Sequence, residues 1–234
     1  MLYTCSDTGE NYTMDFTFED RLSDSPLVDT IWRTYSSQAG VFQSQAVSHW
    51  EMVVWHYEGE TRITVRGPET KVTQADSPPD TEFFGIRFKV GSYMPYLPMK
   101  KLVDNDLTFP EATGKAFWLG SEVWEIPTFD SADVFDARMK RKGLLANDSV
   151  ISAVLSDQPT ELSVRALQYR FKNVTGLTQN AIRQIERSRQ ATTLLQQGQS
   201  ILDVTHEMGY FDQAHLTRSL KRFMGQTPSE LMNS

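Results

Sequence analysis

The chain has 234 residues, of which 39% are hydrophobic and 11% aromatic, and its formal net charge is −7 at neutral pH. This length and composition fit two ordinary globular domains with their own cores, and they exclude a disordered or fibrous protein. Residues 1–149 hold 14 Lys and Arg against 23 Asp and Glu, whereas residues 150–234 hold nine against seven. The acidic excess therefore lies in the N-terminal part, and the C-terminal part is mildly basic.

Neither an export signal nor a membrane span is evident. No stretch approaches the roughly 20 apolar residues that a membrane helix needs, and the first ten residues lack a basic start and an apolar core. The single cysteine, Cys5, cannot form an internal disulfide, and no metal-ligand pattern or basic neighbour surrounds it. We expect an incidental thiol in a cytoplasmic protein without a membrane partner.

The N-terminal part has the pattern of β-structure. Residues 47–66 contain short runs of β-branched and aromatic residues, broken at 58–60, which predicts a hairpin. Residues 83–90 predict another strand, and turn residues at 67–68, 77–79 and 91 separate these pieces. A small antiparallel sheet or barrel follows from this spacing. A helix is expected afterwards, over residues 134–145.

Four residues of the hairpin suggest a metal site, because imidazole and carboxylate are the ligands of non-haem metals. They are His49, Glu51, His56 and Glu58. In an extended strand, however, residues 49 and 56 point to opposite faces. We therefore predict no metal and no cofactor, and interpret these residues as polar groups at strand edges.

All five tryptophans lie in the N-terminal part, where aromatic side chains with a polar handle can line a small-molecule pocket or fill the core. Arg87 lies on the strand 83–90 and is able to meet an anionic ligand, although a strand arginine more often faces solvent. The candidate effector pocket consists of Trp50, Trp55, Arg87, Tyr93, Tyr96, Trp118 and Trp124.

The C-terminal part predicts helices. Residues 162–176 form one, with Ser163 as a cap and Leu167 and Phe171 on its buried stripe. Residues 178–197 form a longer helix without an internal Pro or Gly, which is able to act as a rigid spacer. Its arginines, Arg183, Arg187 and Arg189, are either phosphate contacts or simply solvated.

Residues 201–228 predict two short helices joined at Gly209 and closed at Gly225. Ser200 is able to cap the first helix and Asp212 the second. In the second helix Leu216, Leu220 and Phe223 make an apolar stripe, while polar and basic residues face mostly elsewhere. Arg and Gln hydrogen-bond to guanine and adenine edges, and Lys and Arg neutralise phosphates. A solvated face on an ordinary helical hairpin has a similar composition.

The stretch that starts GYFDQAHLTR at Gly209 and runs through Phe223, Gly225, Thr227 and Pro228 closely resembles the second helix-turn-helix of the AraC/XylS family of transcription regulators. Residues 162–176 resemble the first recognition helix of that family and its closing Thr-Gly. The resemblance implies two helix-turn-helix units, set by the spacer helix about one turn of DNA apart. The N-terminal pattern is similar to the cupin-like or otherwise β-rich sensor domains of many such regulators.

The resemblance also implies the DNA-binding residues. Those of the second recognition helix are Asp212, Gln213, His215, Thr217, Arg218, Lys221 and Arg222. Those of the first are Arg165, Gln168, Tyr169, Arg170 and Lys172.

The chain departs from the family pattern in its first unit. Between residues 150–155 and Leu162 lie only six residues, 156–161, too few for a complete supporting helix and its turn. We therefore expect a truncated first unit, which packs against the N-terminal domain or contacts only phosphates. Base reading is assigned to the second unit.

The sequence thus predicts an α+β protein. Residues 1–140 form a β-rich, barrel or cupin-like domain for sensing or dimerisation, and residues 141–234 form an all-α DNA-binding domain with the second helix-turn-helix over residues 200–224. The expected function is a non-enzymatic, sequence-specific transcription regulator controlled by an effector or partner. Its expected partners are double-stranded DNA, a small-molecule effector, a second copy of the chain and RNA polymerase.

Two other functions remain open. One is a metal-dependent cupin-like enzyme with an appended helical domain. The other is a ligand-independent DNA-binding protein whose N-terminal domain only dimerises.

Overall fold

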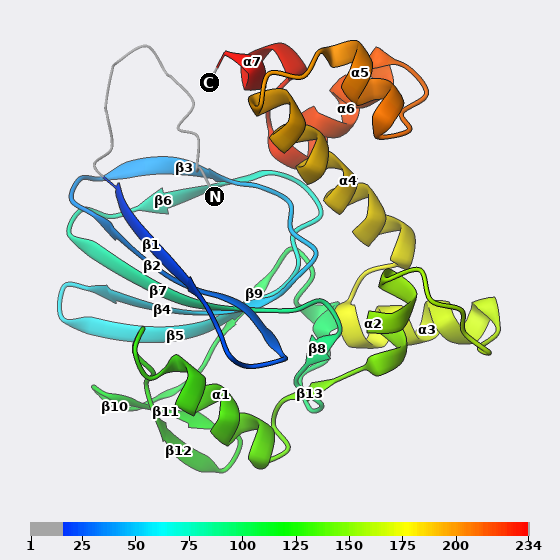
Figure 1. The fold of residues 1–234 in the computed structure, drawn as a ribbon. Coiled ribbons are helices and arrows are strands. Elements are labelled where there is room, and N and C mark those ends of the chain that lie inside the picture. Colours follow the sequence, from blue (N-terminus) through cyan, green and yellow to red (C-terminus); the bar gives the residue numbers. More distant parts are fainter. Residues whose placement is uncertain (1–15, 234) are drawn as a thin grey trace.

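The computed structural model describes residues 16–233, so the prediction for Cys5 lies outside the described residues (Figure 1). The strand-rich N-terminal part is confirmed. Its main sheet has six antiparallel strands, which follow one another across the sheet in the order β1 (Phe16–Leu22), β2 (Val28–Ser36), β7 (Thr81–Phe88), β4 (Glu51–Tyr57), β5 (Glu60–Arg66) and β9 (Asp106–Thr108). The predicted hairpin is β4–β5, and the predicted strand 83–90 is β7. Within the described residues the edge strands β1 and β9 do not pair with each other, so hydrogen bonding does not close this sheet into a barrel.

Three smaller sheets accompany the main one. The strands β3 (Gly40–Ser44) and β6 (Thr73–Ser77) form a two-stranded ribbon that lies across from β4 and β5 (Figure 1). A three-stranded meander consists of β10 (Glu111–Thr113), β11 (Ala116–Leu119) and β12 (Glu122–Glu125). The short strands β8 (Ser92–Tyr93) and β13 (Ala146–Asn147) pair next to the helical part.

The N-terminal core lies between one face of the main sheet, the meander and helix α1 (Ala132–Arg141). Ile31, Met52 and Ile86 face inward from three neighbouring strands, and Trp124 and Phe135 meet them from the meander and the helix. Apolar burial of this extent is the main stabilising contribution to a domain. Helix α1 ends before the predicted residue 145, since Gly143 adopts a φ of +70°.

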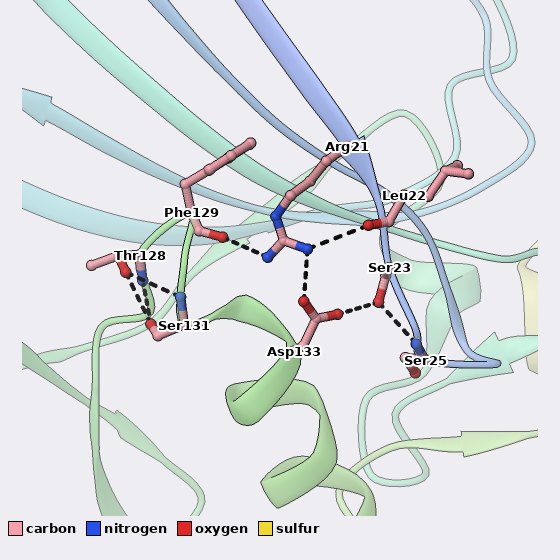
Figure 2. A network of polar contacts seen from close by, with 8 residues as sticks. All are labelled: Arg21, Leu22, Ser23, Ser25, Thr128, Phe129, Ser131 and Asp133. Carbon is pink, nitrogen blue, oxygen red and sulfur yellow. Dashed lines mark hydrogen bonds and ion pairs between the residues drawn. The ribbon is translucent and has the colours of Figure 1, made fainter.

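Polar contacts attach α1 to strand β1 (Figure 2). The Arg21 guanidinium donates to the Asp133 carboxylate at 2.7 Å and to the Phe129 carbonyl at 2.8 Å. The Ser23 hydroxyl donates to the other Asp133 oxygen. Burial alone raises the pKa of Asp133, but the hydrogen bonds from Ser23 and Arg21 outweigh it and hold the pKa below its usual value. The first turn of α1 is therefore fixed to the edge of the sheet.

Six helices form the C-terminal part. They are α2 (Ser149–Leu155), α3 (Val164–Thr175), α4 (Gln179–Gln196), α5 (Ile201–Glu207), α6 (Gln213–Met224) and α7 (Pro228–Met232). Their core surrounds α4, where Ile185 and Leu195 pack with Val204 of α5 and with Leu216 and Leu220 of α6. None of the helices in the described part of the chain has the length and apolarity to span a membrane.

The two parts of the chain share a continuous apolar contact. Ala46, between β3 and β4, is fully buried in the helical core. Val90 and Val103 of the N-terminal part are partly buried against the same core, and Tyr93 packs against both cores. The helical part is therefore docked on the β-rich part.

Candidate nucleic-acid interface

Helices α5 and α6 form the predicted helix-turn-helix. The Ser200 hydroxyl accepts from the Asp203 amide at 3.1 Å and caps α5, and the Asp212 carboxylate accepts from the His215 amide at 2.6 Å and caps α6. Gly209, at a φ of +67°, makes the turn, and Gly225, at +81°, ends α6. Both boundaries and both caps agree with the sequence.

Helix α6 is strongly amphipathic. Leu216, Leu220, Phe223 and Met224 are buried against α4 and α5. The other face is open to solvent, with the exposed residues Gln213, Ala214, Arg218, Lys221 and Arg222. One face is thus fixed in the core, and the other is free to enter a groove.

The exposed cations of α6 suit a phosphate backbone. Within the described part of the chain, Arg218, Lys221 and Arg222 form no salt bridge. The Arg222 guanidinium lies 5.0 Å from the centre of the Phe223 ring. These charges are therefore available to neutralise phosphates or to hydrogen-bond to bases.

Three other predicted residues of this helix have local structural contacts. Asp212 is the N-cap described above. The His215 ring meets the edge of the Tyr210 ring at 5.2 Å, and its Nδ1 accepts from the Phe211 amide at 3.4 Å. The Thr217 hydroxyl donates to the Gln213 carbonyl at 2.9 Å. These contacts shape the turn and the first turns of α6.

Helix α3 presents a second exposed face, on which Arg165, Gln168, Tyr169 and Lys172 lie at helical spacing. Tyr169 is 72% exposed. Arg170 differs, because its Nε donates to the buried carboxylate of Asp148 at 2.6 Å, and Asp148 in turn caps α2. Arg170 therefore joins α3 to α2 in this structure.

The first unit is not shorter than the second, in contrast to the prediction. Helix α2 has seven residues, as does α5, and the connection to α3 is longer than the α5–α6 connection (156–163 against 208–212). Helix α2 itself is the supporting helix of the first unit, so residues 156–163 have only to form its connection to α3.

Helix α3 also packs on the N-terminal part. It contacts β8 and the 3-10 turn η1 (Met99–Lys101). At its end, a Cβ on Gly176 would lie 2.6 Å from Val103 Cγ2 and 2.9 Å from the Met99 carbonyl oxygen. Only glycine permits this close approach. The predicted contact of the first unit with the N-terminal domain is present.

The arginines of α4 contact the protein itself. Arg183 pairs with Asp157 at 2.7 Å on the surface. The Arg187 guanidinium carbon lies 4.2 Å from the centre of the Tyr210 ring, and the Arg189 Nε lies 4.0 Å from the Glu186 carboxylate. Arg187 therefore supports the turn before α6, and Arg189 faces the N-terminal part.

Comparison with protein families identifies the helical part from residue 158 onward. Residues 158–234 match the family model described as a helix-turn-helix domain. These residues form an AraC-type helix-turn-helix domain. No curated protein and no solved structure matches the chain. The AraC-type domain supports a DNA-binding regulator, and the matched segment contains both exposed helix faces, on α3 and on α6.

The AraC-type domain is held at the C-terminal end of α6 by two backbone hydrogen bonds. The Val72 amide donates to the Arg222 carbonyl at 3.0 Å, and the Ala46 amide donates to the Phe223 carbonyl at 2.8 Å. The last carbonyls of a helix lack partners within the helix. Two loops of the N-terminal part provide them here.

A polar pocket lies between α4 of the AraC-type domain and the β-rich part. His49, Arg87 and Arg189 line it together with Glu51, Arg66 and Glu69. Burial, and then the charges of Arg87 and Arg189, hold the pKa of His49 well below its ordinary value. Beside the pocket, the Ser48 hydroxyl donates to Glu186 of α4.

The residues predicted for an effector pocket have different surroundings, although Trp50, Trp124 and Tyr93 all contribute to the N-terminal apolar core. Trp50 stacks on Phe88 with ring centroids 3.9 Å apart, and Trp124 is fully buried beside Phe135. Trp55 is partly buried, and the Arg62 guanidinium carbon lies 5.1 Å from the centre of its ring. Tyr93 is partly buried, and Tyr96 and Trp118 are 47% and 43% exposed. Of the predicted set only Arg87 lines the interdomain pocket.

The four residues that suggested a metal site in the sequence also have different surroundings. His49 and Glu51 both line the interdomain pocket, whereas His56 is exposed and its Nδ1 lies 2.7 Å from the Thr61 hydroxyl. The Glu51 carboxylate accepts from the Trp32 indole at 3.2 Å, and Glu58 lies in the exposed β4–β5 turn. Among residues 16–233 no group of three or more metal-ligating side chains occurs.

The sequence reasoning missed two features of the interface. One is Phe211, which is 91% exposed next to the cap of α6. In the sequence it is one of several apolar residues, and only burial distinguishes it from a core residue. The other is the pair of amides at Ala46 and Val72, for which no side-chain pattern exists.

Proposed function

We propose that this protein is a sequence-specific transcription regulator in which α6 reads bases, α3 adds contacts, and the N-terminal domain controls how both helices engage DNA. The exposed face of α6 supports base reading most directly. It combines Gln213 and Arg218, which are able to form paired hydrogen bonds to bases, with Lys221 and Arg222, which are able to neutralise phosphates. Its opposite face is buried, so the orientation of these groups is fixed.

The proposal is tested by selecting bound duplexes from a random DNA pool with the full chain. We expect an enriched motif of two short elements about 10 base pairs apart, one for each recognition helix. A single short element would restrict base reading to α6. Recovery of sequences no different from the starting pool would reject sequence-specific binding.

Effector control is proposed for the docking between the two parts of the chain. The N-terminal part donates both hydrogen bonds to the end of α6 and packs against α3, so a change there alters the placement of both helices. The pocket that His49, Arg87 and Arg189 line holds only about 30 Å³, roughly the volume of one water molecule, so a small molecule would have to widen it to contact both parts at once. A ligand is effective only if it binds the docked and undocked states with different affinity.

A thermal-shift screen of small organic molecules against the full chain tests this control. A ligand of the native state raises the unfolding temperature by mass action. We expect at least one such ligand to change the affinity for the selected duplex, and Arg189→Ala to weaken the response. A ligand that raises stability without changing DNA affinity would separate binding from regulation. The same proposal includes activation through RNA polymerase, which in vitro transcription tests. It also includes assembly into a homodimer, which sedimentation tests.

A further inference from the structure

Phe211 is the most exposed large apolar residue of residues 17–233, at 91%. Leaving a phenylalanine in water forgoes the free energy that burial of its ring would supply. Single exposed apolar residues are common on protein surfaces, so exposure alone does not assign a role. The position of Phe211 and the rigidity of its surroundings supply the further evidence.

The backbone on both sides of Phe211 is anchored. Tyr210 is buried, and its hydroxyl lies 3.2 Å from the buried Ser188 hydroxyl. Asp212 caps α6, and the Phe211 amide itself donates to the His215 ring. The exposed ring is therefore not part of a loosely held loop. It projects from a fixed point immediately before the first residues of α6.

In helix-turn-helix proteins the N-terminal residues of the recognition helix contact base edges in the major groove. The groove there presents hydrogen-bonding groups and one apolar group, the 5-methyl of thymine. Gln213 and Arg218 on α6 are suited to the polar groups. Among the neighbouring exposed side chains, Phe211 is the large apolar one.

We infer that Phe211 contacts the 5-methyl group of a thymine in the major groove and thereby adds a preference for thymine at one position of the bound site. This inference rests on the proposed reading of bases by α6. Burying a methyl-sized group contributes about fourfold in affinity, because about 0.8 kcal/mol corresponds to that ratio. The preference is therefore modest, and it is confined to one position.

The test uses the full chain and the best duplex from the random-pool selection. Each thymine is replaced in turn by deoxyuridine, which keeps the base pair and lacks the methyl group, and the Kd is measured by fluorescence anisotropy. For the wild-type protein we expect about a fourfold loss at one thymine. Phe211→Ala should bind the thymine and deoxyuridine duplexes equally at that position, whereas Phe211→Tyr, which keeps a ring, should still distinguish them.

Leu202→Ala is the matched control, since Leu202 is 65% exposed on α5 and its loss should leave the discrimination intact. The inference is overturned if no thymine is sensitive, or if Phe211→Ala remains sensitive at the same position. It is also overturned if Phe211→Ala binds every duplex as the wild type does but loses transcriptional activity, which would indicate a protein partner. If the selection itself yields no motif, the proposed function fails first, and the thymine contact fails with it.

Discussion

The outward residues of α6 differ in what they are able to recognise. Arg218 and Gln213 carry paired donors or a donor and an acceptor, whereas Lys221 is a point charge. Arg218→Ala and Gln213→Ala should each cost about 1 to 3 kcal/mol and relax the base preference at one position. Lys221→Ala should weaken binding to all sequences and reduce the salt slope by about one. Anisotropy titrations on selected and random duplexes at several salt concentrations measure both effects.

Arg183→Ala serves as a control, because Arg183 pairs with Asp157 on the surface. Its removal should leave the base preference unchanged. Equal losses on selected and random DNA for Arg218, Gln213 and Lys221 variants would contradict base reading by α6.

We expect His49, which lies between the two parts of the chain, to make their contact sensitive to pH. Burial, and then Arg87 of β7 and Arg189 of α4, oppose its protonation, while Glu51 of β4, Arg66 of β5 and Glu69 line the same pocket. Since its pKa in the folded chain is lowered, the unfolded chain binds the proton more readily. The stability contributed by neutral His49 is present above a pH of about 6.5 and decreases as the pH falls below that value.

We expect the thermal midpoint of the wild-type chain to decrease between pH 7 and pH 5 more steeply than that of His49→Gln. Differential scanning fluorimetry of both proteins in matched buffers measures the difference. Parallel curves for the two proteins would contradict the prediction.

At the scale of elements, we expect the cap of α6 to affect the stability of the helix and not its base preference. Asp212→Ala removes the acceptor for the His215 amide and should destabilise the helix by about 1 kcal/mol. Binding to all duplexes should weaken without a change in base preference. Asp212→Ser, which also caps, should restore the thermal midpoint. A changed motif for Asp212→Ser in a repeated selection would instead assign a base contact to the carboxylate.

The elements that the sequence predicted best have strong local signals. The spacer expected over 178–197 is α4 at Gln179–Gln196, because an uninterrupted helical pattern is bounded by Thr178 and Gly198. The sequence predicted the caps Ser200 and Asp212 and the closing Gly225 equally well. Strands β1 to β3 were not located individually, since their polar residues alternate with few apolar ones and their pairing partners lie far away in sequence.

The candidate site was predictable only on its exposed side. The outward face of α6 follows from helical periodicity, so its exposed residues could be named in advance. Helix α2 was missed as a supporting helix because its seven residues carry a weak pattern. The two hydrogen bonds to the end of α6 join backbone groups 150 and 177 positions apart, and no local pattern encodes them.

At the scale of the whole molecule, docking of α3 on η1 and β8 predicts that the AraC-type domain is incomplete when isolated. A fragment of residues 145–234 loses Ala46, Val90 and Val103 from its core. We expect faster amide hydrogen exchange in α3 of this fragment than in the full chain, while α4 to α6 stay protected.

The same fragment tests the need for assembly. Its mildly basic charge implies modest electrostatic affinity for DNA, so dimerisation or cooperative binding should be required for tight occupancy. Gel-shift titrations of the fragment and the full chain at physiological salt compare them. Tight binding by the monomeric fragment would contradict this prediction.

The two hydrogen bonds from Ala46 and Val72 act at the C-terminal end of α6, whose buried face is packed on α4 and α5. The helix has 12 residues and is therefore about 18 Å long. A tilt of about 5° around the C-terminal end moves the other end by about 1.6 Å, which is enough to break a hydrogen bond to a base. Because α6 is packed on α4 and α5, a small shift of the two loops would tilt these helices together, and the displacement would be largest at the far end of α6, where Phe211 and Gln213 would meet DNA.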